Sequence, residues 1–209
     1  MDIPAFFAAS SNRRTVCIDS TFQGMLPTPS SGEIPLSEIS DRIRREVRAP
    51  VVVMDHSSLR NRSFNGSLTK HLKVRGTEPW LMTHVETVDD LFDAFNGNTE
   101  MVLAPLHTIL SEYELEDIHA VSDSFIPVVY CTGAEAMVMK GRRSGIGMAL
   151  DDLADHGFYK VCIMDCDGSI EDSEWESIAE DHPSVIPFNI GRDAKVEGFE
   201  VGISVIGLH

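Results

Sequence analysis

The sequence has no long apolar run and no recognisable export signal. None of its apolar stretches reaches the roughly 18 residues that a membrane-spanning helix needs. The segment Met1–Phe7 carries an acid where a signal peptide carries basic residues, and its apolar part is short. We therefore expect a cytoplasmic protein that does not enter a membrane.

Cysteines are few, and no two of them have the spacing of a redox or zinc motif. The four cysteines are separated by at least three residues and form no CxxC pair. Three of them lie in or at the end of apolar runs, where a free cysteine behaves as a small hydrophobic residue. We expect reduced, inert thiols at Cys17, Cys131, Cys162 and Cys166.

Basic residues are scarce. The chain has 17 Lys and Arg against 33 Asp and Glu, which gives a net charge of −16. Such a surface repels nucleic acid and anionic lipid. The composition therefore favours a small molecule over nucleic acid or membrane as the binding partner.

Short apolar runs recur along the chain, and most of them end in polar residues. Runs of this kind are typical of strands buried on both faces of a parallel sheet. Residues 1–14 are interpreted as a lead-in, Phe22–Gly32 and Ser57–Gly66 as polar loops, and the whole chain 1–209 as one domain. The eight predicted strands are Thr15–Asp19, Val51–His56, Pro79–His84, Met101–His107, Phe125–Cys131, the run within 160–169, Ser184–Ile190 and Val201–Leu208.

Helical patterns separate most of these strands, and eight is the number of strands that closes a (β/α)8 barrel. Only Gly191–Glu200 joins the last two strands, which is too short for an ordinary crossover helix, and no helix follows the eighth strand. The sequence therefore predicts a TIM-type barrel whose last two helices are reduced or missing. An open, doubly wound parallel sheet is the alternative.

The order of these segments resembles the ProFAR isomerase family of histidine biosynthesis, and especially its archaeal relatives, which are (β/α)8 barrels. Cys17–Asp19 is similar to the first strand of that family, Val53–Asp55 to its second, and Met164–Ser169 to the segment after its sixth. The resemblance implies a site at the carboxyl ends of the strands. It implies catalytic roles for Asp19, Asp55 and Asp165, and ligand contacts for Asp167, Ser169 and Asn189.

The chain also departs from that family. The glycine runs that bind substrate phosphates after strands three and seven are replaced by Met82–Val85 and Pro187–Ile190. Cys131 stands where the second catalytic Asp is expected, so only one of two required acid–base groups remains. True ProFAR isomerase activity is therefore not expected.

Three histidines follow three successive predicted strands. In a barrel, His56, His84 and His107 would converge on one mouth, where imidazoles together with carboxylates suit a divalent metal ion. The alternative is that they hydrogen-bond to neighbouring loops without metal, because no H-x-H or H-E-x-x-H spacing is present. Both interpretations stay open on the sequence alone.

One cluster of basic residues lies in Lys140–Gly147. Lys140, Arg142 and Arg143 lie among glycines just before a predicted helix, which is a plausible anion site that could replace the lost phosphate loops. A solvated surface loop is the alternative.

Three functions follow for the whole chain. The first is a barrel that binds or converts a small molecule, a phosphosugar being one candidate. The second is a scaffold or regulatory barrel without catalysis, whose mouth would be filled by loops such as Phe22–Gly32. The third is a metal-dependent enzyme that uses His56, His84 and His107. The missing helices would leave apolar barrel surface open, so we also expect a homo-oligomer.

Overall fold

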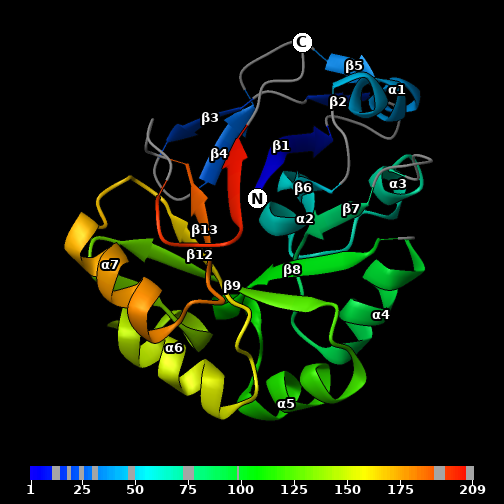
Figure 1. The fold of residues 1–209 in the computed structure, drawn as a ribbon. Coiled ribbons are helices and arrows are strands. Elements are labelled where there is room, and N and C mark those ends of the chain that lie inside the picture. The colour runs from blue at the N-terminus through cyan, green and yellow to red at the C-terminus, as the bar shows by residue number, and fades with distance from the viewer. Residues whose placement is uncertain are drawn as a thin grey trace.

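The chain folds into a closed barrel of eight parallel strands surrounded by helices, which is the (β/α)8 or TIM-type fold (Figure 1). The computed structural model describes residues 1–10, 15–17, 20–23, 26–29, 33–46, 50–72, 78–97, 99–190 and 196–205. Pairing of β8 with β9 closes the ring, which excludes the open doubly wound sheet. The barrel strands are β1 (Asp2–Ser10), β6 (Val51–Asp55), β7 (Pro79–Met82), β8 (Met101–Pro105), β9 (Phe125–Thr132), β12 (Cys162–Asp165), β13 (Ile186–Asn189) and β14 (Gly202–Val205).

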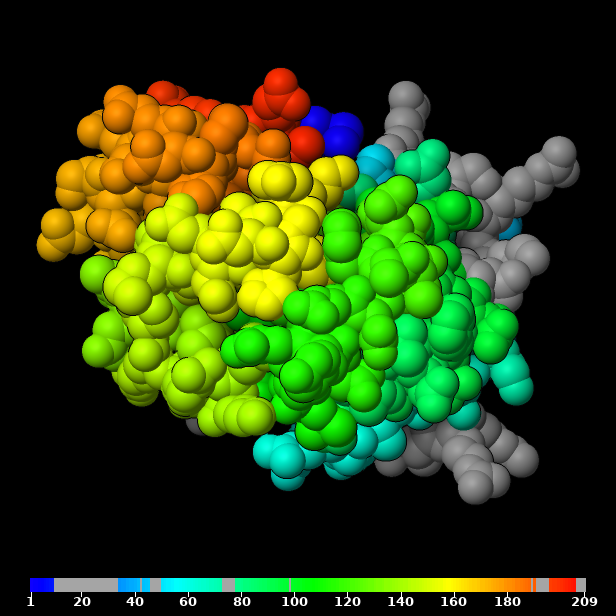
Figure 2. Space-filling model, turned by 90° about the horizontal axis from the view of Figure 1, so that it is seen from below, coloured from blue at the N-terminus to red at the C-terminus, as the bar shows by residue number. Residues whose placement is uncertain are grey.

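Four consecutive helices cover one side of the barrel without interruption. Figure 1 shows α4, α5, α6 and α7 following one another around it, and from below they form one continuous surface that runs from green to orange (Figure 2). The described residues between β13 and β14 form no helix, and the predicted loss of the last two helices stays a prediction, because residues 191–195 and 206–209 lie outside the described part of the chain. The helices are α1 (Leu36–Glu46), α2 (His56–Asn61), α3 (Gly66–Thr69), α4 (Val88–Asn96), α5 (Glu112–Val121), α6 (Ile146–Asp155) and α7 (Asp172–Asp181), with short 3-10 turns η1 (Leu106–Thr108) and η2 (Met139–Gly141).

The first barrel strand differs from the prediction. Asp2–Ser10, interpreted as a lead-in, is β1, and it pairs in parallel with both β14 and β6. Thr15–Cys17, part of the predicted first strand, is a short strand β2 that runs antiparallel to β1 and to β5 (Glu33–Pro35). The run Ile3–Ala9 supplies the uninterrupted apolar stretch that a strand buried on both faces requires, whereas Thr15–Cys17 is too short to span the barrel.

Two predicted loops also contain regular structure. Phe22–Gly32 includes the end of β3 (Ser20–Gln23) and all of β4 (Leu26–Pro29), which pair with each other as a hairpin. Ser57–Gly66 includes most of α2. Two further strands, β10 (Glu135–Met137) and β11 (Arg143–Gly145), extend the sheet beyond β9. No helix in the described part of the chain is long and apolar enough to cross a membrane.

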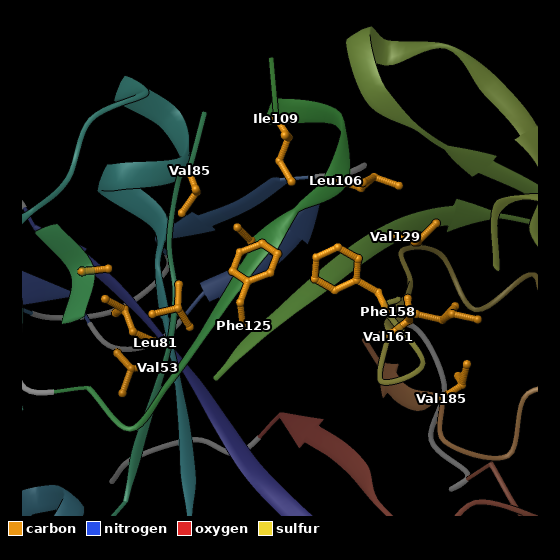
Figure 3. Close-up of a cluster of buried hydrophobic side chains, with 14 of the residues drawn as sticks. Val53, Leu81, Val85, Leu106, Ile109, Phe125, Val129, Phe158, Val161 and Val185 are labelled. Atoms are coloured by element: carbon orange, nitrogen blue, oxygen red, sulfur yellow. The ribbon is translucent and has the colours of Figure 1, made fainter. Parts of the chain in front are cut away.

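Alternate residues of each strand face opposite sides of the barrel wall. One buried cluster fills the interior with side chains from the barrel strands, among them Met54, Tyr130 and Phe188. The other packs the outer face of the strands against the helices, and Figure 3 shows part of it, with the Phe125 and Phe158 rings 6.0 Å apart. The interior is apolar at every level, so any site must lie above it, at the mouth.

Candidate functional site

A pocket of about 620 Å³ opens at the carboxyl ends of β6, β7 and β8. This end of the barrel is where TIM barrels carry their active sites. Helix α2 and its C-cap, the loop after β7, and the turns η1 and η2 supply the walls. The polar and charged lining includes Arg60, Arg62, His84, Glu86, His107 and Lys140.

Two of the three cations in this pocket occupy an unfavourable backbone conformation. Arg62 has φ 52° and Lys140 has φ 59°, and they are the two non-glycine residues with positive φ in the described part of the chain. Arg62 ends α2, where its N–H donates to the Ser58 carbonyl, and such a left-handed C-cap is usually glycine. Lys140 precedes Gly141, which is also left-handed, so η2 turns sharply at the pocket rim.

The one carboxylate among the lining residues is engaged with a histidine. The Nε2 of His84 lies 3.0 Å from Oε1 of Glu86, and the His84 side chain is 4% exposed. The other ring nitrogen, Nδ1, is buried and has no hydrogen-bond partner in the described part of the chain. In the described structure, no ion pair joins Glu86 to Arg60, Arg62 or Lys140.

His107 lies between the pocket and the barrel interior. Its ring meets the edge of Tyr130, with the ring centres 5.1 Å apart. Burial is the largest cause that lowers the pKa of His107, and the nearby charges of His84 and Arg62 lower it further. A neutral imidazole at physiological pH can donate or accept one hydrogen bond but brings no charge.

The three histidines predicted at strand ends are only partly brought together. His84 and His107 line the same pocket, whereas His56 begins α2 and is absent from its lining. Burial, and then the charge of Arg60, lowers the pKa of His56. No group of three His, Cys, Asp or Glu side chains placed to hold a metal ion is found among the described residues. The metal site stays a prediction.

The predicted mouth residues do lie at one end of the barrel. Asp55, Asp165 and Asn189 end β6, β12 and β13, on the same side as His84 and His107, while Asp19 lies outside the described residues. Asp55 follows the outward-facing Val51 and Val53, and Asp165 follows Ile163. The two carboxyl groups therefore face the helix layer rather than the barrel axis.

Both acids hold the turns that follow their strands. Asp55 Oδ1 accepts from the Ser58 N–H at 3.0 Å, and Asp165 Oδ1 accepts from the Ser169 N–H at 3.1 Å. Burial raises the pKa of Asp55 to about 6 and also raises that of Asp165. In each, Oδ2 is buried and has no hydrogen-bond partner among the described residues. A structural role is visible for both, and their catalytic role stays a prediction.

The predicted ligand-binding residues lie at several places. Arg143 pairs with Glu135 across the β10–β11 hairpin, and both side chains are exposed. Ser169 donates to Asp167, and its hydroxyl accepts from the Gly133 N–H at 2.6 Å, so both residues brace a loop. Arg142 lines a smaller pocket of about 360 Å³ that shares Lys140 with the larger one. The side chain of Asn189 is not described.

The prediction missed Arg60 and Arg62 because it assigned them to a polar loop. A signal for them existed, since they follow Asp55 and Ser58, whose spacing suits a helix N-terminus capped by the aspartate. A short helix there places its last turn, and thus both arginines, over the mouth.

The assembled site contains three cationic side chains, two imidazoles and one carboxylate above an apolar barrel interior. This combination suits an anionic organic ligand that enters from solvent. No model of a known protein family matches this chain, and no curated protein matches its sequence.

Proposed function

We propose that this barrel binds an anionic small molecule in the pocket above β6, β7 and β8. Phosphate and carboxylate groups are the anions that Arg and Lys side chains recognise best. A phosphosugar is one ligand of this class. In a chain with net charge −16, three cations around one cavity also create a local attraction for anions that the rest of the surface lacks.

One observation carries the proposal: among the described residues, the two left-handed residues other than glycine, Arg62 and Lys140, are both basic and both line this pocket. A non-glycine side chain in this conformation costs about 1–2 kcal/mol, and glycine would avoid that cost. Residues held in such conformations cluster at ligand-binding and active sites. Function is therefore the simplest reason for Arg and Lys, rather than glycine, at positions 62 and 140.

The test measures binding and stability together in glycine variants. Isothermal titration calorimetry with inorganic phosphate, and then with ribose 5-phosphate, should show binding to the original protein. The variants Arg62→Gly and Lys140→Gly should lose at least tenfold in affinity. Their free energy of unfolding should stay constant or rise by up to about 1 kcal/mol, because glycine tolerates positive φ.

A matched control comes from α1. Arg44 is 59% exposed and pairs with Asp41 on the helix surface, so Arg44→Ala removes the same charge without touching the pocket. It should bind phosphate as the original protein does. If the original protein binds neither ligand at millimolar concentration, or if Arg44→Ala weakens binding as much as Arg62→Gly, the pocket is not an anion site.

The scaffold alternative, with a mouth filled by loops such as Phe22–Gly32, stays a prediction, because residues 24, 25 and 30–32 of that loop lie outside the described residues. Assembly into a homo-oligomer stays a prediction. The structure changes one premise of it, because β1, which was interpreted as a lead-in, is part of the barrel wall between β14 and β6.

A cytoplasmic location also stays a prediction, and the free thiols of Cys131, Cys162 and Cys166 are compatible with it.

A further inference from the structure

Glu86 is held in place from several directions. Its backbone N–H donates to Asp90 Oδ2 at 2.9 Å, and its backbone carbonyl accepts from the Leu110 N–H at 3.1 Å. Its side-chain Oε1 is 3.0 Å from the Nε2 of the buried His84. Main chain and side chain are therefore both fixed before any ligand arrives.

The histidine that orients Glu86 is itself fixed. The His84 backbone N–H donates to Ser58 Oγ at 3.2 Å, and Ser58 Oγ lies 2.6 Å from Thr83 Oγ1. Ser58, Thr83 and His84 are all buried. This network connects the start of α2 with the end of β7, so the carboxylate has a rigid support rather than a flexible loop beneath it.

Within the described residues, the second oxygen of Glu86 is not engaged. Oε2 has no hydrogen-bond partner in the described part of the chain, and the Glu86 side chain is 35% exposed and lines the pocket. Arg60, Arg62 and Lys140 line the same pocket, yet none of them forms an ion pair with it in the described structure. The pocket therefore offers cationic donors and, separately, one fixed anionic acceptor.

We propose that Glu86 is the specificity-determining residue of this pocket and that the ligand is an organic anion which also carries a hydroxyl or ammonium donor. This inference rests on the proposed anion binding. The basic residues would hold the phosphate or carboxylate, and Glu86 Oε2 would accept a hydrogen bond from the donor group. A ligand without the donor would meet the Glu86 charge unpaired, so the site would reject it.

Three two-carbon phosphate monoesters isolate this contact: ethyl phosphate, 2-hydroxyethyl phosphate and O-phosphoethanolamine. They share the phosphate and the chain length and differ in the terminal group. Calorimetry on the original protein should show at least tenfold tighter binding of a donor-bearing ester than of ethyl phosphate, the size expected of a hydrogen bond to a charged group. In Glu86→Gln this preference should collapse and ethyl phosphate should bind more tightly, because the repelling charge is gone.

Glu112→Gln is the matched control, because Glu112 lines the adjoining smaller pocket and its loss removes the same charge nearby. It should keep the preference. Glu86→Asp retains the charge, but its shorter side chain does not reach His84 as Glu86 does, so it should lose most of the preference. This variant replaces Glu86→Gln in the test if Glu86→Gln does not fold. Equal binding of the three esters, or a preference that survives in both Glu86 variants, overturns the role of Glu86 and leaves the anion site intact. Absence of binding of all three esters and of inorganic phosphate overturns both proposals.

Discussion

The buried carboxyl group of Asp55 should make the stability of this protein depend on pH in an unusual direction. Burial removes the carboxyl group from water and raises its pKa from 3.8 to about 6, although hydrogen bonds from the Ser58 backbone and the Asn65 side chain oppose the shift. One oxygen, Oδ2, is buried, and no described residue forms a hydrogen bond with it. The folded state therefore retains a proton that the unfolded chain releases.

The sign follows from comparing the two states. Below pH 3.8 Asp55 is protonated in both states, so its ionisation takes nothing from the free energy of unfolding. Between pH 3.8 and about 6 the unfolded chain ionises first, so stability falls as pH rises, and above this window the loss is complete. Each pKa unit corresponds to about 1.4 kcal/mol, which gives a total loss of about 3 kcal/mol at neutral pH.

Urea unfolding of the original protein and of Asp55→Asn measures this loss directly. Asparagine keeps an acceptor for the Ser58 N–H but cannot ionise. The free energy of unfolding of the original protein, minus that of the variant, should fall by about 2.5 kcal/mol from pH 4 to pH 8. Asp117→Asn on the exposed face of α5 provides the baseline. A difference for Asp55→Asn that stays flat across this range would refute the reasoning.

Other substitutions test the fold. Phe6→Ala should lower the free energy of unfolding by about 3–5 kcal/mol, because Phe6 is fully buried in β1, whereas Met1→Ala should change little because Met1 is 61% exposed. A small effect of Phe6→Ala in urea unfolding would contradict the position of β1 in the barrel. Gly157→Ala should destabilise by more than about 1 kcal/mol, because φ is +88° and the new Cβ would lie 2.5 Å from His119 Nε2. Gly147→Ala, in α6 with open space around it, should stabilise by about 0.5–1 kcal/mol, and thermal melting of the two variants should therefore shift in opposite directions.

Apolar runs predicted seven of the eight barrel strands, because each is buried on both faces and reads as continuous hydrophobic sequence. The same rule applies to Ile3–Ala9, which was interpreted as part of a lead-in, and Pro4 is a local feature that speaks against a strand there. Proline cannot donate to a sheet ladder and is rare in central strands. Pro4 nevertheless lies within β1, opposite Ser204. The barrel tolerates it there because of tertiary packing, which the local sequence does not reveal.

The site was predictable in position but not in composition. The strand ends indicated the correct end of the barrel. Side chains alternate between the two faces of a strand, and continuing this alternation past the strand ends points His84 and His107 toward the barrel axis and Asp55 and Asp165 toward the helices. The left-handed backbone of Arg62 and Lys140 leaves no sequence signal comparable to a glycine. Such features depend on how α2 and η2 end against their neighbours.

The position of β1 between β14 and β6 makes barrel closure a late event in folding. Asp2 pairs with Gly202, so residues 200 positions apart must meet before the ring is complete. Closing a loop of that length costs about 5 kcal/mol of chain entropy. At about 5–20 residues per second, a ribosome needs roughly 10–40 s to make the chain between them. Throughout that interval β1 keeps an unpaired edge, and β13 keeps one from its own synthesis onward, so the nascent barrel is open to pairing with a neighbouring chain until its last strand is made.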